Sequence, residues 1–190
     1  YTNLSHNRKK DNFTIGHFGL YNELRDHAFL WDVIKQINTD IVGFQSELKL
    51  LFAGQVYSEF FTQMENKSLI NNVEYHSNLE HSKAIKKMME CDILLVTQSN
   101  TSDVQGRLPA KFFEYLAARI PIIGIGQKNS DLDHLMSKIS SCWFVDFDNF
   151  QSLYDTIKRI YDMRTLNTQY NDDITTFSRQ EQVKKISSLI

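Results

Sequence analysis

The amino-acid sequence predicts an α/β domain: a Rossmann-like, doubly wound parallel sheet of six strands with helices on both faces. Short apolar segments alternate with amphipathic segments at a spacing of roughly 25 residues, as in repeated strand-helix units. Residues 92–96 and 121–125 are almost continuously apolar. Strands of this kind are covered on both faces, and right-handed crossovers place helices there.

Six strands are expected where short runs are rich in apolar, β-branched and aromatic residues. These runs lie at residues 13–18, 47–53, 73–75, 92–96, 121–125 and 142–145. Gly19 and Gly54 follow the first two runs, and a glycine is a suitable residue for the turn that ends a strand.

Helices are expected between the strands because apolar residues recur there at spacings of three and four. These segments are residues 25–37, 56–66, 80–90, 109–120, 130–138, 150–161 and 179–189. Ser130 is expected to cap one helix, with the Asp133 carboxylate as its reciprocal partner. Asp148, followed by Gln151, is expected to cap the next.

The chain of 190 residues is long enough for one good core and short for two. Residues 1–12 are polar and without period, which indicates a linker or tail from an amino-terminal domain outside this sequence. Residues 13–165 form the predicted domain, and residues 166–190 a connection and a last helix. Because the first residue is Tyr1, we expect a fragment of a longer protein.

The composition excludes several classes of protein. The net charge of −2, with both signs interspersed, argues against a nucleic-acid partner. Cys91 and Cys142 form no disulfide framework, and each is expected to be buried beside a strand. No apolar run approaches the roughly 20 residues of a membrane span, and no signal peptide is recognisable, so we expect a cytoplasmic location.

Several familiar sites are also absent from the sequence. Gly16 and Gly19 do not have the spacing of a dinucleotide fingerprint, and there is no Walker lysine motif or G-x-S-x-G elbow. The six histidines lack the H-E-x-x-H arrangement of a zinc site, so no metal is expected.

The stretch from Ser99 to Gly126 is the part that best fits a binding site, because a loop, a helix start and cations meet there. Pro109 suits the first helical position. The spacing predicts one apolar side, made of Phe112, Phe113, Leu116, Ala117 and Ile120. It predicts an opposite side made of Lys111, Glu114, Tyr115 and Ala118.

Lys111 is informative because a cation in the first turn opposes the helix macrodipole unless an anion is bound there. The free N–H groups of a helix start are themselves an anion site, and Arg107 adds a second cation. Glu114 would then accept hydrogen bonds from a sugar with vicinal hydroxyls. The alternative, an ordinary solvated helix face, has about equal weight from the spacing alone.

Topology gives the same location independently. In parallel sheets ligands bind at the carboxyl ends of the strands, where the strand order reverses. Residues 99–111 are one of the loops at those ends, together with the helix start that follows it.

These residues resemble a known family. The run RLPAKFFEYLA, from Arg107 to Ala117, followed by IPIIGI, from Ile120 to Ile125, is similar to the donor-binding signature of GT-B glycosyltransferases related to family 4. Residues 13–19, 50–54, 72–75 and 84–96 resemble the preceding strands and helix of the carboxyl-terminal half of such enzymes. The amino-terminal, acceptor-binding half is expected to lie outside this sequence.

The resemblance implies a role for each matching residue. Glu114 matches the glutamate that holds the ribose hydroxyls of a nucleoside-diphosphate sugar. Arg107, Lys111 and Arg25 lie where cations would meet the diphosphate, and Lys111 and Arg25 are expected to support catalysis. Gly19 matches the glycine after the first strand. Tyr75 and His76 lie where the family packs the base.

Two departures from the family pattern affect this assignment. Gly106 stands where many members have a first glutamate that contacts the donor sugar, so that contact is missing or supplied by Asp103 or Gln105. Leu20 stands where many members have a basic residue directly after the glycine.

The family resemblance implies transfer of a glycosyl group from a nucleotide sugar to a polysaccharide, glycan or lipid-linked acceptor. Neither a cofactor nor a metal is expected, and the missing half would allow peripheral membrane association. Two alternatives stay open: a non-catalytic nucleotide-sugar sensor, favoured by Gly106, and a sugar-nucleotide epimerase of the same architecture.

Overall fold

The computed structural model describes residues 12–101, 103–164 and 170. The strands are β1 (Phe13–Phe18), β2 (Leu48–Ala53), β3 (Val73–His76), β4 (Ile93–Thr97), β5 (Ile122–Gly126) and β6 (Cys142–Asp146). The helices are α1 (Ala28–Asp40), α2 (Phe44–Glu47), α3 (Glu59–Asn66), α4 (His81–Glu90), α5 (Ala110–Ala118), α6 (Asp131–Met136) and α7 (Phe150–Met163), and a 3-10 turn spans Ile70–Asn72.

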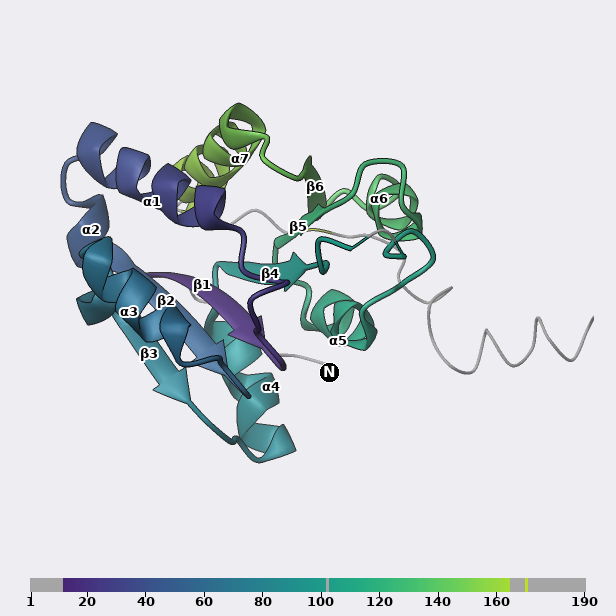
Figure 1. Ribbon diagram of the computed structural model, residues 1–190, viewed down its shortest axis with the longest axis horizontal. Coiled ribbons are helices and arrows are strands. Elements are labelled where there is room, and N and C mark those ends of the chain that lie inside the picture. Colours follow the sequence, from purple (N-terminus) through teal and green to yellow (C-terminus); the bar gives the residue numbers. More distant parts are fainter. Residues whose placement is uncertain (1–11, 102, 165–169, 171–190) are drawn as a thin grey trace, which may run out of the picture.

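The six strands form one sheet in the order β3-β2-β1-β4-β5-β6 (Figure 1). Every neighbouring pair is parallel. The order runs outward in both directions from β1 and β4, which is the arrangement of a doubly wound, Rossmann-like sheet. The predicted fold class is therefore confirmed.

Apolar side chains cover both faces of the sheet, as continuously apolar strands require. One core lies under α1, α2, α3 and α7 and includes Trp31, Phe44 and Phe60. The other lies under α4, α5 and α6 and includes Phe112 and Leu132. Figure 1 shows α1 and α7 on one side of the sheet and α4 and α5 on the other.

Two expected helices begin three residues late, at Ala28 and Glu59. The loops before them pair with each other, because Tyr21 and Val56 form an isolated parallel β-bridge. The four-residue helix α2 was not expected, and it takes Glu47 out of the predicted second strand. Such contacts join distant loops and leave no local periodicity for a sequence pattern to detect.

The predicted caps are partly correct. The Ser130 hydroxyl accepts a hydrogen bond from the backbone N–H of Asp133, as predicted, but the Asp133 carboxylate accepts from Asn129 rather than Ser130. The cap of α7 is Asn149, not Asp148, which has a left-handed backbone with φ of 62°. Cys91 is buried, whereas Cys142 is only half-buried.

Residues 1–11 and 179–189, expected as a tail and a helix, lie outside the described residues. Across the part of the chain that the structure describes, no helix is sufficiently long and apolar to span a membrane.

The predicted apolar side of α5 is wrong in part. Tyr115 and Ala118 are buried with Phe112 and Leu116, whereas Phe113 is 37% exposed. Tyr115 turns inward because its hydroxyl accepts from the backbone N–H of Phe18, with an oxygen-to-nitrogen distance of 2.7 Å. It also lies 3.3 Å from the Phe18 carbonyl, to which it donates. Tyr115 therefore ties α5 to the end of β1.

Replacing Tyr115 by phenylalanine is expected to lower the free energy of unfolding by about 1–3 kcal/mol, because the Phe18 N–H would stay buried without an acceptor. Urea denaturation measures this change. Tyr154→Phe is the matched control, since its hydroxyl bonds to Asp40 at an exposed position. Equal effects of the two substitutions would contradict the role given to Tyr115.

His17, in β1, is buried between two carbonyl groups. Its Nδ1 lies 3.1 Å from the Leu95 oxygen and its Nε2 lies 3.3 Å from the Leu20 oxygen. Burial lowers the pKa of His17 from 6.5 to about 4, although the two carbonyl contacts oppose this shift. The neutral imidazole is therefore the form that the folded protein favours.

Stability should consequently fall as the pH drops from 6.5 to 4, where the unfolded chain binds a proton that the folded chain does not. Over this window His17 is expected to account for about 3 kcal/mol of the free energy of unfolding. Urea denaturation between pH 4 and 7 should show a shallower loss for His17→Gln than for the wild type. His134→Gln, at an exposed position, should keep the wild-type slope, and identical slopes for all three proteins would refute this assignment.

Candidate functional site

The sheet carries a pocket of about 320 Å³ at the carboxyl end of β4. Three segments line it: Arg25 from the loop after β1, residues 97–99, 104 and 107 from the end of β4 and its loop, and residues 108–110 at the start of α5. β1 and β4 are neighbours, and the strand order reverses between them. The pocket thus lies at the switch point, where the sequence analysis expected the site.

The start of α5 is accessible from this pocket. Pro109, predicted as the first helical residue, is instead the N-cap of α5, and the helix begins one residue later, at Ala110. Both residues line the pocket. Because the first N–H groups of a helix have no acceptor within it, this end is suited to an anion.

Asp26 orders the loop that carries Arg25. Its carboxylate accepts hydrogen bonds from the Trp31 indole at 2.7 Å, from the Tyr21 hydroxyl at 3.1 Å and from the Tyr57 hydroxyl. The Arg25 guanidinium donates to the Leu20 carbonyl at 2.9 Å. Arg25 therefore lies in an ordered loop rather than at the predicted helix start.

Gln98 links the loops that surround the pocket. Its buried amide nitrogen donates to the Arg107 carbonyl at 3.2 Å. Its amide oxygen accepts from the Gln127 N–H at 3.2 Å and from the Ser130 hydroxyl at 3.3 Å. A β-carbon at Gly126 would lie 2.1 Å from that oxygen, so Gly126 leaves the space the amide needs.

His27 fixes the same region from the other side. Its Nε2 lies 2.9 Å from the Gln98 carbonyl, and its ring is buried. Burial lowers the pKa of His27, so that the neutral imidazole donating to this carbonyl is favoured. Through His27 the start of α1 is attached to the loop after β4.

Lys111 and Glu114 are adjacent, as predicted. Their Nζ and Oε2 atoms are 2.8 Å apart, and both side chains are a little over one-third exposed. Gly19 lies beside them, because a β-carbon built on it would be 3.9 Å from Lys111 Cγ. With φ of 126°, Gly19 has a backbone conformation that other residues rarely adopt.

Arg107 lies at the rim of the pocket and pairs with Asp103, with both side chains more than half exposed. The Thr101 hydroxyl also donates to Asp103 at 2.7 Å. This hydrogen bond and the Arg107 charge lower the pKa of Asp103. Asp103 is therefore engaged by Arg107 and Thr101, and its predicted contact with the donor sugar stays a prediction.

Tyr75 and His76 lie at the end of β3, with β2 between them and β1. They do not line the pocket. The Tyr75 ring packs edge-on against Phe61, and His76 Nε2 is 2.6 Å from the Glu74 carboxylate. Their predicted position beside a base stays a prediction.

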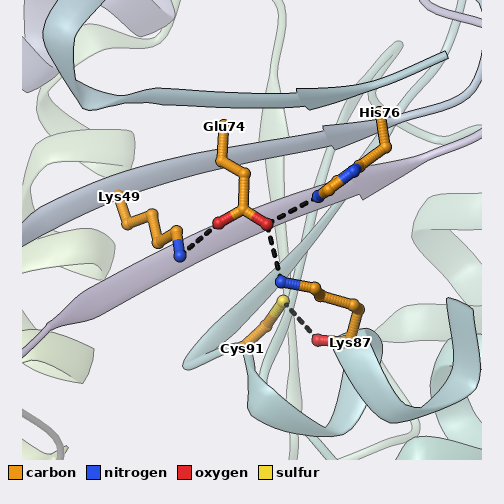
Figure 2. A network of polar contacts seen from close by, with 5 residues as sticks. All are labelled: Lys49, Glu74, His76, Lys87 and Cys91. Atoms are coloured by element: carbon orange, nitrogen blue, oxygen red, sulfur yellow. Dashed lines mark hydrogen bonds and ion pairs between the residues drawn. The ribbon is translucent and has the colours of Figure 1, made fainter. Parts of the chain in front are cut away.

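Glu74 is the centre of the polar network around His76. Figure 2 shows Lys49, His76 and Lys87 converging on its carboxylate. Burial by itself would raise the pKa of Glu74, but these three partners outweigh it and lower the pKa to about 2. The Glu74 network is separate from the pocket and stabilises the β2–β3 edge.

The structure thus gathers most of the predicted residues into two adjacent groups: Arg25 with Arg107 at the pocket, and Lys111 with Glu114 and Gly19 beside it. The sequence analysis missed Thr97, Gln98, Asp26 and His27. A signal was present for the first two, since polar residues directly after a buried strand commonly face a site.

Comparisons with known proteins agree at the level of the fold. No family model and no curated protein sequence matches this chain. Among solved structures, a TarM variant from S. aureus in complex with Fondaparinux, alpha-GlcNAc-glycerol and UDP has a TM-score of 0.72 at 14% identity. That match covers 98% of this chain and 37% of TarM.

Two further structures match over most of the chain. WaaG, a glycosyltransferase involved in lipopolysaccharide biosynthesis, has a TM-score of 0.64 at 12% identity, over 84% of this chain and 40% of WaaG. A protein from Listeria monocytogenes that is assigned as a UDP-N-acetylglucosamine 2-epimerase has a TM-score of 0.53 at 9% identity. That match covers 95% of this chain and 46% of that protein.

The chain spans less than half the length of each of these proteins. The similarity concerns the fold, since the identities are low. The chain has the fold of one domain of the GT-B glycosyltransferases.

Proposed function

We propose that this chain is the donor-binding domain of a glycosyltransferase and binds a nucleoside-diphosphate sugar. The observation that carries the proposal is the accessible start of α5, which lines a pocket together with Arg25 and Arg107. Two arginines and a helix amino-terminus that line one pocket favour a phosphorylated ligand.

The Lys111–Glu114 ion pair beside the pocket is the reason to expect a nucleoside at one end of this ligand. Glu114 offers carboxylate oxygens to the two ribose hydroxyls, and Lys111 contacts the diphosphate. Gly19 allows the ligand to approach the backbone after β1. Tyr75 and His76, at the end of β3, would flank the base.

The chemistry that we propose is breakage of the bond between the anomeric carbon and the diphosphate oxygen. Negative charge then grows on the leaving diphosphate. Lys111, Arg25, Arg107 and the N–H groups at the start of α5 would stabilise that charge. In this proposal these cations take the role that a metal ion has in other transferases.

Transfer also needs an acceptor site, which we assign to a second domain. Each solved structure named above is more than twice as long as the segment it shares with this chain. A UDP complex of TarM supports nucleotide binding by this fold. We further propose a cytoplasmic protein that reaches a polysaccharide, glycan or lipid-linked acceptor at the inner face of a membrane.

A second candidate function is a nucleotide-sugar sensor without catalysis, and Gly106 favours it. A β-carbon built on Gly106 would approach only Asp131 Oδ2, at 4.0 Å, so the backbone there does not require a glycine, and the glutamate of the family pattern is absent. Transfer of a labelled sugar by the full-length protein separates an enzyme from a sensor.

Nucleotide binding tests the main proposal. Isothermal titration of the chain with UDP and GDP should give binding by at least one of them, weakened about tenfold or more by Lys111→Ala, because a charge-assisted contact is lost. Glu114→Gln should weaken the ribonucleotide much more than its 2′-deoxy analogue, which already lacks one of the two hydroxyls.

Lys158→Ala is the matched control, since Lys158 forms a similar exposed ion pair with Asp162 in α7. It should leave binding unchanged. Absence of binding by both nucleotides, or equal losses in all three variants, would overturn the proposed site.

A further inference from the structure

Thr97 ends β4 and lines the pocket. The residue is only 3% exposed. Its hydroxyl oxygen is buried and has no hydrogen-bond partner among the described residues. A buried hydroxyl without a partner destabilises a protein, because it gives up water and gains nothing in return.

The position of this hydroxyl distinguishes it from similar groups. Four other described residues, Asn22, Asn38, Gln63 and Arg164, also have a buried side-chain atom without a partner. None of the four lines the pocket. Among the described residues, Thr97 is thus the one that both lines the pocket and has a buried hydroxyl without a partner.

The surroundings of Thr97 define which partner it lacks. Arg25, Arg107 and the start of α5 line the same pocket, and none of the described residues that line it has a carboxylate. Such an environment attracts an anionic oxygen, to which a hydroxyl can donate a short, charge-assisted hydrogen bond. A phosphoryl oxygen fits these requirements.

The order of groups along α5 indicates which phosphoryl group reaches Thr97. Glu114 and Lys111 lie outside the pocket, and residues 108–110 line it. A nucleotide whose ribose is held by Glu114 therefore has its first phosphate near Lys111. Its second phosphate lies further toward the helix start, over the end of β4.

We propose that the Thr97 hydroxyl donates a hydrogen bond to the distal phosphoryl group of the bound nucleoside diphosphate, and so distinguishes a diphosphate from a monophosphate. This inference rests on the proposed function and adds to it Thr97, which was not among the predicted site residues. In the ligand-free protein the unsatisfied hydroxyl lowers the free energy of unfolding, and the bound ligand supplies the missing acceptor.

Thr97→Val tests the inference, because valine has the same shape and no hydroxyl. We expect about ten- to a hundredfold weaker binding of UDP or GDP, the loss of one hydrogen bond to a charged group. Binding of UMP or GMP should change less than about twofold, on the same reasoning. The thermal midpoint of the ligand-free chain should stay equal or rise, since an unsatisfied group is removed.

Thr97→Ser should keep the preference for the diphosphate, and Thr97→Ala provides a second variant without the hydroxyl if valine impairs folding. Thr156→Val is the control, because it removes a threonine hydroxyl that donates to the Ser152 carbonyl in α7, outside the pocket. It should leave the binding of both the diphosphate and the monophosphate unchanged.

Equal losses for diphosphate and monophosphate, or an unchanged diphosphate affinity in Thr97→Val, would overturn the role of Thr97 while leaving the proposed function intact. A wild-type chain that binds no nucleotide would instead overturn the proposed function.

Discussion

The site depends on the pairing of β1 with β4, through Ile15 opposite Ile93 and Gly16 opposite Leu94. Because the strand order reverses there, the chain leaves β1 toward α1 in one layer and leaves β4 toward α5 in the other. The two loops therefore separate above the sheet and cannot fill the space between them. Gly16 permits this pairing to coexist with Cys91, whose sulfur would lie 2.5 Å from a β-carbon at that position.

Most of the fold could be predicted from the sequence, because buried strands and amphipathic helices leave local patterns. The errors lie where distant residues decide a local conformation. The late start of α1 follows from the contacts of Asp26 with Trp31 and Tyr57, and the inward side of α5 follows from the hydrogen bond between Tyr115 and the Phe18 backbone. Neither contact can be predicted from the spacing of apolar residues along the chain.

The same distinction explains which site residues were predicted. Arg107, Lys111 and the start of α5 are consecutive in sequence, so the combination of cations and a helix start was visible. Gln98 acts through Gln127 and Ser130, which are 29 and 32 residues away. Its role arises only when β4 and β5 lie side by side, and no spacing along the chain encodes it.

The backbone around the pocket is held by buried hydrogen bonds, whereas two of the cations in and beside it are held by exposed ion pairs that a ligand can replace. Gln98 is buried and holds the loop through several hydrogen bonds, whereas Lys111 and Arg107 are held by Glu114 and Asp103 at exposed positions. Exposed ion pairs contribute only about 0–1 kcal/mol, so an incoming phosphate can replace either carboxylate at little cost. In the proposed function, Lys111 turns to a phosphate, and Glu114 is then released to accept hydrogen bonds from sugar hydroxyls. On this proposal, the ion pair holds the Lys111 and Glu114 side chains beside the pocket until a ligand with both a phosphate and a sugar binds.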